Sequence, residues 1–275
     1  MSRALLVANE TIGGRPLIEK AKELHAEDPD LSIVICVPRT NPRHGNIIYD
    51  EAVFQAAQVR VDLARGFLRE LGIDAVGEVG DPDPYTAAMD AIREWHPDRV
   101  IVSTYPATVS GWLRRDLVER IADASGLPVD HVITDLDGEG LPFKVTLVVA
   151  NRTASSPQLL DRLRALHAED SSRLFIVVVP QEGGHGQHFL AARGRLGQML
   201  DKLRRDGLLA AGMVGDPDPY TATMQALQFF RVDDIIISTL GPERSGWMRA
   251  DLVERVKRAT NCPVEHVVAE EEVAA

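Results

Sequence analysis

Residues 79–87 read VGDPDPYTA, and the same nine letters return at residues 214–222. An identity of that length, with two prolines in it, indicates that the chain holds two versions of one unit. The period is far longer than the ~20–50 residues of solenoid repeats. In a chain of 275 residues, each unit is large enough for a hydrophobic core of its own. The sequence therefore predicts a tandem of two similar domains.

Other matched residues fix the alignment of the two units. Trp112 matches Trp247 at an offset of 135 residues (247 − 112), as do the two nonapeptides. Nearer the N-terminus the offset grows to 142, because Asn9 matches Asn151 (151 − 9). The change falls between the second and third expected strands. We therefore expect unit two to have the shorter helix or loop at that place.

Between the two units, residues 135–142 are acidic and rich in glycine and proline, with no apolar period. Such a composition is typical of a connecting segment. We expect a first domain at 1–135, a linker at 136–142 and a second domain at 143–275.

The composition is that of a soluble globular protein, with 45% hydrophobic residues and a formal net charge of −11. An acidic chain is a poor partner for nucleic acid, whose binding surfaces are basic. No apolar run is long enough to span a bilayer. Cys36 and Cys262 occupy non-equivalent positions and are expected to be free thiols in a reducing compartment. We expect a cytoplasmic protein without a nucleic-acid or membrane partner.

Short apolar runs alternate with helical patterns in both units, which predicts a parallel sheet covered by helices on both faces. In the fifth run of unit one, apolar and polar residues alternate, which favours a strand at a sheet edge or at a contact between units. The expected strands are 5–8, 33–37, 75–79, 100–102 and 129–133 in unit one and 147–150, 175–179, 213–214, 235–237 and 264–268 in unit two. The expected helices of unit one are 16–26, 49–71, 84–95 and 112–124.

The order of elements in both units resembles that of the universal stress protein family. The resemblance is also carried by residues 101–103, which run into the helical stretch 112–121 and then into 127–129. It implies an α/β fold of two tandem doubly wound parallel five-stranded sheets with strand order 3-2-1-4-5, of the adenine nucleotide alpha-hydrolase-like type. It also implies a role in the stress response, binding of ATP or AMP, and pairing through the fifth strand, as an internal pseudo-dimer or a homodimer.

In a sheet with this strand order, ligands bind beyond the carboxyl ends of the first and fourth strands, where the order reverses. Polar residues that are identical in both units follow these strands, and a histidine–glycine pair follows each second strand. The expected start of the fourth helix carries a serine and an arginine, which fit either an anion site or a capped helix with solvated arginines. The candidate ligand-binding residues are Asn9, His44, Ser103, Thr104, Ser110 and Arg114 in unit one and Asn151, His185, Ser238, Thr239, Gly241, Ser245 and Arg249 in unit two.

The chain departs from the glycine pattern of the ATP-binding members of that family, in which Gly, two residues, Gly and nine residues precede Gly and Ser or Thr. Glycine is kept only at Gly241, and the aspartate that commonly meets the nucleotide after the first strand is asparagine in both units. The substituted positions are Ser103, Pro106, Arg115 and Asp116 in unit one and Ser238, Ala250 and Asp251 in unit two. The ATP-binding motif is therefore degenerate, more so in unit one.

The repeated nonapeptide also fits a structural role. Asp83 is placed as a helix N-cap and Pro84 as the first residue of the helix. Asp81 precedes a proline and should be extended. These features favour a rigid strand-to-helix turn over a catalytic role for the aspartates. For Tyr85 and its counterpart Tyr220, they favour packing over stacking on a ligand.

The favoured hypothesis is a cytoplasmic binding or regulatory protein for a small anionic ligand, with ATP, AMP or cyclic AMP as candidates. The alternative is an interaction protein whose nucleotide clefts are vestigial. A nucleotide hydrolase is the third hypothesis, for which the sequence offers no nucleophile and no acid–base pair. No metal is expected, because no acid or cysteine completes a ligand set with His185 and His188, and unit one lacks the second histidine.

Overall fold

The structure is a computed structural model. It describes residues 2–40, 50–106, 116–183, 186–241, 243, 245–249 and 251–270, with only the backbone for Met248 and Arg249. The chain forms two compact units, of which the first ends at Pro142 and the second runs on from Phe143. Each unit has a sheet and a core of its own.

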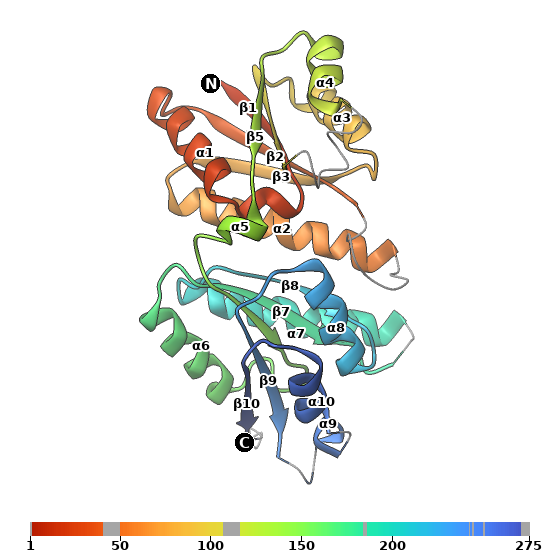
Figure 1. Ribbon diagram of the computed structural model, residues 1–275. Helices are drawn as coiled ribbons and strands as arrows, with labels where there is room; N and C mark the ends of the chain where they lie inside the picture. The colour runs from red at the N-terminus through yellow and green to blue at the C-terminus, as the bar shows by residue number, and fades with distance from the viewer. Residues whose placement is uncertain are drawn as a thin grey trace. The chain divides into compact units, whose positions relative to one another are not determined.

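Unit one is a five-stranded parallel sheet in the order β3-β2-β1-β4-β5, as the resemblance implied. One face packs against α1 and α2 and the other against α3 and α4 (Figure 1). The strand β5 lies at the sheet edge, as its alternating pattern predicted. The elements are β1 (Arg3–Val7), η1 (Glu10–Gly13), α1 (Arg15–Glu27), β2 (Ser32–Pro38), α2 (Asp50–Glu70), β3 (Asp74–Gly80), α3 (Pro84–Trp95), β4 (Arg99–Thr104), α4 (Leu117–Ser125), β5 (Val129–Ile133) and α5 (Leu136–Glu139).

Unit two repeats this arrangement, with its sheet in the order β10-β9-β6-β7-β8, which is the same order read from the other end. Its elements are β6 (Val145–Val149), α6 (Pro157–Glu169), β7 (Leu174–Pro180), α7 (Gly186–Arg205), β8 (Ala210–Gly215), α8 (Pro219–Phe229), β9 (Asp234–Leu240), α9 (Gly246–Arg249), α10 (Leu252–Ala259) and β10 (Val264–Ala269). The expected shortening is confirmed, since residues 181–185 separate β7 from α7, whereas residues 39–49 separate β2 from α2.

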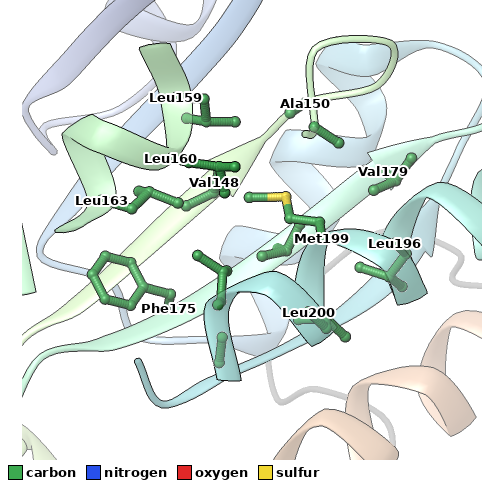
Figure 2. Packing of buried hydrophobic residues seen from close by; sticks show 14 of the residues in the cluster. Val148, Ala150, Leu159, Leu160, Leu163, Phe175, Val179, Leu196, Met199 and Leu200 are labelled. Atoms are coloured by element: carbon green, nitrogen blue, oxygen red, sulfur yellow. The ribbon is translucent and has the colours of Figure 1, made fainter. Parts of the chain in front are cut away.

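The core of unit two lies between its sheet and the two helices α6 and α7. Leucines of α6 recur at helical spacing, so that one stripe of the helix faces the sheet. The strands contribute apolar side chains from one pleat face, because successive residues of a strand point to opposite sides. Figure 2 shows the packing of Val148, Ala150, Phe175 and Val179 from the strand side against Leu159, Leu160 and Leu163 of α6 and Leu196, Met199 and Leu200 of α7.

The fourth helix differs from the expectation of one continuous helix from residue 112. In unit one, α4 begins at Leu117, after Asp116 in the left-handed region (φ 48°), and residues 112–115 lie outside the described part. In unit two, α9 and α10 are separate helices, with Asp251 at φ 54° before the second. A left-handed residue interrupts the regular helical hydrogen bonds, so the continuous helix is wrong.

The segment expected to be a featureless linker contains a turn of helix, α5. The carboxylate of Asp135 caps it by accepting from the N–H groups of Asp137, at 3.2 Å, and Gly138, at 3.0 Å. Leu136 is buried, which ties the segment to the body of unit one.

The repeated nonapeptide forms the turn that the sequence predicted. In unit one, Asp83 Oδ2 accepts from the N–H and the hydroxyl of Thr86, both at 3.0 Å, and Asp81 Oδ1 accepts from the N–H of Asp83 at 2.8 Å. Asp216, Asp218 and Thr221 make the same three contacts in unit two. Both aspartates of each copy are therefore engaged in holding the turn.

Each nonapeptide needs its glycine because the backbone of the third strand packs closely against the third helix at that position. A Cβ added at Gly80 would lie 2.6 Å from the Cβ of Ala87. At Gly215 the same atom would lie 2.7 Å from the Cβ of Ala222. Atoms that close clash, so only glycine opposite alanine allows this packing.

The tyrosine of each nonapeptide packs on the next helix, as expected. The guanidinium of Arg120 lies 4.0 Å from the ring centroid of Tyr85. The guanidinium of Arg255 lies 4.2 Å from that of Tyr220. These cation–π contacts join α3 to α4 and α8 to α10.

Replacing Gly215 with alanine should lower the free energy of unfolding by about 1–3 kcal/mol, because the new methyl group overlaps Ala222 and Val178. Urea denaturation measures the change. Gly197→Ala is the matched control: it lies within α7 with nothing within 4 Å, and should raise stability by about 1 kcal/mol or less. Equal stability of Gly215→Ala and the wild type would contradict the close approach.

Removing the cap with Asp218→Ala should cost about 1 kcal/mol, because two hydrogen bonds to Thr221 are lost at the start of α8. Asp218→Asn keeps a capping oxygen and should cost less. Thermal denaturation of the two variants makes the comparison. A larger loss of stability for Asp218→Asn than for Asp218→Ala would contradict the capping role of this side chain.

Candidate functional site

The order of the strands reverses beside β1 in unit one and beside β6 in unit two, each of which pairs with a fourth strand on one side. The carboxyl ends of these strands meet at one edge of the sheet. Asn9 follows β1 directly after Ala8, and Asn151 follows β6 directly after Ala150. The expected location of these asparagines is therefore confirmed.

The side chain of Asn9 is buried, with 6% of its surface exposed. Its Nδ2 donates to the main-chain oxygen of Pro38 at 3.1 Å and to the hydroxyl of Thr40. Because the Pro38 oxygen can only accept, the orientation of the amide is fixed. Asn9 Oδ1 is buried and has no hydrogen-bond partner among the described residues, and the same holds for Asn151 Oδ1.

A hydroxyl from the loop after the first strand fastens that loop to the fourth strand in both units. Thr11 Oγ1 donates to the main-chain oxygen of Ser103 at 3.2 Å. Thr153 Oγ1 donates to that of Ser238 at 3.0 Å. The loop that carries each asparagine is therefore held across the carboxyl ends of the two strands.

Ser103 and Ser238 were expected after the fourth strands but lie within the last residues of β4 and β9, because these strands are longer than expected; both are buried, but they differ in their contacts. Ser103 Oγ lies 3.2 Å from Thr134 Oγ1. Ser238 Oγ has no hydrogen-bond partner within the described part of unit two. Unit two therefore presents unpaired atoms on both Asn151 and Ser238 at this edge.

The threonines that follow these serines are engaged inside the protein. Thr104 Oγ1 donates to the main-chain oxygen of Tyr105 at 2.9 Å and lies 2.8 Å from Nε2 of His131. The hydroxyl has one proton, which either the main-chain oxygen or an unprotonated Nε2 can accept, so the tautomer of His131 decides the direction of the bond between them. Thr239 repeats both contacts at 2.8 Å, with Leu240 and His266.

The direction of these bonds bears on catalysis. A hydroxyl nucleophile donates its proton to the histidine that acts as its base. Here the hydroxyls of Thr104 and Thr239 are buried between strands, and each also has a main-chain oxygen within hydrogen-bond distance as an acceptor. The arrangement is therefore a structural bond between the fourth and fifth strands.

Several expected site residues lie outside the described part of the chain. They are His44, Ser110, Arg114, His185 and the side chain of Arg249. Their participation in a site stays a prediction.

In unit two, Ser245 is buried and its N–H donates to the main-chain oxygen of Gly241 at 3.0 Å. A Cβ added at Gly241 would meet nothing within 4 Å, so there is open space beside its backbone. Ser245 precedes only the four-residue α9, whereas the longer α10 begins after Asp251. Ser245 therefore does not open one long helix, and its part in an anion site stays a prediction.

Two charged groups of residues at the carboxyl edge were missed by the sequence analysis. In unit one, Tyr105 Oη donates to Glu10 Oε2 at 3.0 Å. Arg60 of α2 is buried; burial lowers its pKa, and the adjacent Glu10 and Tyr105 act in the opposite direction. Unit one thus has an internal carboxylate beside a buried guanidinium.

The corresponding edge of unit two has a different set of charges. Arg152 Nε donates to Glu182 Oε1 at 2.9 Å, and Arg195 Nη2 lies 3.8 Å from the same oxygen. The hydrogen bond from Arg152 lowers the pKa of Glu182, and the charges of Arg195 and His188 add to the effect. One carboxylate is therefore shared by two guanidinium groups.

The signal for both groups was present in the repeat alignment. Arg60 and Arg195 keep the offset of 135 (195 − 60), although an arginine within a helix does not attract attention by itself. Glu10 and Arg152 are also aligned, at the offset of 142 (152 − 10), and have opposite charges. A search for identical residues passes over such a reversal.

Both cysteines are free thiols, as expected. Burial raises the pKa of the Cys36 thiol to about 12, and nearby Glu78 and Asp90 add to the shift. Its Sγ lies 3.7 Å from the main-chain oxygen of Ala87. A thiol so difficult to ionise is unreactive, which agrees with a structural role.

Within the described residues, no group of three or more histidine, cysteine, aspartate or glutamate side chains is placed to hold a metal ion. None of the described helices has the length and apolar character needed to cross a membrane.

Comparison with known proteins gives similarities of structure alone. No family model and no curated protein matches the chain. A universal stress protein from Archaeoglobus fulgidus is similar at 14% identity and a TM-score of 0.36, over 98% of this chain and 96% of that one. A universal stress protein family protein from Arabidopsis thaliana, solved with AMP bound, is similar at 12% identity and a TM-score of 0.34, over 50% of this chain and 95% of that one.

A precorrin-6A reductase is also similar, at 12% identity and a TM-score of 0.26, over 100% of this chain and 91% of that one. At such identities and TM-scores, these similarities do not bear on what this chain binds.

Burial lowers the pKa of both His131 and His266 below the ordinary 6.5. As the pH falls, the unfolded chain then takes up these protons before the folded chain does. Above pH 6.5 these histidines should not reduce the free energy of unfolding. As the pH drops from 6.5 toward their lowered pKa values, the free energy of unfolding should decrease. Urea denaturation at several pH values between about 5 and 8 measures the slope.

The double variant His131→Gln with His266→Gln is the comparison. Glutamine can still donate to the two threonine hydroxyls but does not titrate in this range. We expect a flatter pH dependence than in the wild type. An unchanged slope would assign the pH dependence to other groups.

Proposed function

We propose that this chain is a cytoplasmic binding or regulatory protein of the universal-stress-protein type, which takes a small anionic ligand at the carboxyl edge of its sheets. Adenine nucleotides are the ligand class that the sequence resemblance suggests. The observation that carries the proposal is the buried Oδ1 of Asn9, which has no hydrogen-bond partner in the part of the chain that the structure describes, and the same finding at Asn151.

A buried acceptor without a partner costs about 1–3 kcal/mol. One such atom could belong to the irregularity of a single loop. The same atom unpaired at the same place in both units supports a common use, the acceptance of a hydrogen bond from a ligand.

An asparagine oxygen suits the hydroxyl or amino group of a nucleotide, since both are donors. Unlike a carboxylate, it adds no negative charge that would repel a phosphate group. Asparagine in place of the family's aspartate is therefore compatible with an anionic ligand. The open space beside Gly241 lies at the carboxyl end of β9, directly after Leu240.

The structure offers less support for an enzyme. The two threonine hydroxyls are buried, and each lies between a main-chain oxygen and a histidine of the neighbouring strand. The aspartates of both nonapeptides hold their own turns. Binding without turnover is the function that these contacts favour.

Isothermal titration calorimetry of the full chain with ATP, AMP and cyclic AMP tests the proposal. We expect saturable binding of at least one of them, together with a rise in the melting temperature. Absence of both heat and thermal shift with all three nucleotides would count against the proposal.

Asn9→Ala combined with Asn151→Ala should weaken that binding about ten-fold, the effect of one lost hydrogen bond of ordinary strength. Asn261→Ala is the control, because Asn261 is an exposed asparagine that precedes β10 at the opposite edge of the sheet. If the double variant and the control bind the nucleotide with equal affinity, Asn9 and Asn151 do not contact the ligand.

A second candidate function is that of an interaction protein, favoured by the edge strands β5 and β10. Ile133 is 53% exposed and its counterpart Val268 is 47% exposed, and each belongs to the last strand of its sheet. Exposed apolar residues on a sheet edge invite pairing with another strand. Light scattering after Ile133→Lys and Val268→Lys would reveal such pairing as a change in molecular mass.

A further inference from the structure

Three aligned positions lie at the carboxyl edge of each unit; one has the same residue in both units, and the other two have different residues. Arginine is common to both, as Arg60 in α2 and Arg195 in α7. Where unit one has Glu10 after the first strand, unit two has Arg152. At the carboxyl end of the fourth strand, unit one has Tyr105, directly after β4, and unit two has Leu240, the last residue of β9. The groups that surround the shared arginine in unit one are thus absent from the aligned positions of unit two.

In unit one the negative charge at this place is supplied by the chain itself. Tyr105 Oη holds Glu10 Oε2 at 3.0 Å, between the ends of β1 and β4. Arg60 lies close enough to both for their charges to act on it. The carboxylate of Glu10, held by Tyr105, is therefore an anionic group of the chain whose charge acts on the shared arginine.

In unit two, Arg195 has no such carboxylate within hydrogen-bond distance. Its Nε and Nη2 are buried and have no hydrogen-bond partner among the described residues. The carboxylate of Glu182 lies 3.8 Å away and is already bonded to Arg152 at 2.9 Å. A buried guanidinium with unused donors is stabilised by any oxyanion that reaches it.

Both arginine side chains are partly exposed to solvent, although Nε and Nη2 of Arg195 are themselves buried. The side chain of Arg152 is 70% exposed and that of Arg195 is 26% exposed. Asn151 and Ser238, whose unpaired oxygens lie at the same edge, are neighbours of this position through the chain and the β6–β9 pairing. Charge, unused donors and unused acceptors thus occur together in unit two.

We propose that unit two alone binds an oxyanion, a phosphate or a phosphate monoester, through Arg195 and Arg152, and that Glu10 is a built-in substitute for this anion in unit one. The inference rests on the proposed function, because it assigns the ligand's anionic group to one of the two edges. A guanidinium group matches the oxygens of a phosphate in geometry and in charge, which makes phosphate the fitting class of anion.

Calorimetric titrations of the full chain with inorganic phosphate, AMP and adenosine test the inference. We expect one equivalent of phosphate or of AMP per chain. Arg195→Gln should weaken this binding at least about ten-fold, since a charged hydrogen-bonding partner is removed. Arg164→Gln is the control: Arg164 forms surface ion pairs with Asp161 and Asp206, and its loss should leave the affinity unchanged. Far-UV circular dichroism shows that both variants are folded.

The probes distinguish the source of the anion. Dependence on Arg195 with inorganic phosphate indicates a free oxyanion, and dependence on Arg195 with AMP alone indicates a nucleotide; either result supports the inference. Two equivalents per wild-type chain, or equal affinity of Arg195→Gln and Arg164→Gln, would overturn it while leaving the proposed function standing. Absence of binding of every probe would defeat both.

Two charge exchanges test the role assigned to Glu10. Arg152→Glu gives unit two a carboxylate of its own, so phosphate binding should be lost while the melting temperature is kept or raised. Glu10→Gln removes the substitute anion from Arg60 but keeps an acceptor for Tyr105, so a second equivalent of phosphate should bind. A stoichiometry of one for Glu10→Gln would overturn the idea that Glu10 occupies the place of the anion.

Discussion

At the glycine of each nonapeptide, the third strand lies so close to the third helix that no side chain fits between them. An added Cβ would lie 2.6 Å from the facing alanine at Gly80 and 2.7 Å from it at Gly215. Because the helix lies this close, the tyrosine of its first turn reaches an arginine of the following helix. That helix packs in turn on the fourth strand, as Leu117 and Ile121 do in unit one, and the fourth strand ends at the candidate site. The nonapeptide thus begins a series of packing contacts that runs from the third strand, through the third and fourth helices, to the fourth strand and the edge where a ligand would bind.

Most of the fold could be predicted, because the positions of helices and strands follow from the alternation of apolar runs and the strand order is what the family resemblance implies. The helix Pro84–Trp95 was predicted to the residue, since its cap and its proline are local signals. The start of the fourth helix could not be predicted. Apolar residues keep a helical period on both sides of Asp116, whereas the left-handed conformation of Asp116 depends on the surrounding structure. The short α5 has too few residues to show any period.

The location of the candidate site could also be predicted, because a topological rule places it at the ends of the first and fourth strands. The hydrogen bonds within the site could not. Whether the hydroxyl of Thr104 is available depends on His131, which belongs to another strand. The charged residues around Arg60 and Arg195 escaped notice for a different reason. A comparison that looks for identical residues finds Asn9 and Asn151 but passes over positions where the charge is reversed, such as Glu10 and Arg152.

The carboxylate of Glu10 belongs to the same molecule as the arginine that it accompanies. A tethered group has an effective concentration that dilution does not change. A unit that carries its own anion keeps the same stability whatever the solution contains, whereas a unit that takes its anion from solution becomes more stable as that anion accumulates. If Arg195 takes its anion from solution as proposed, the stability of the second unit would rise with the concentration of that anion, whereas the stability of the first unit would not change with it.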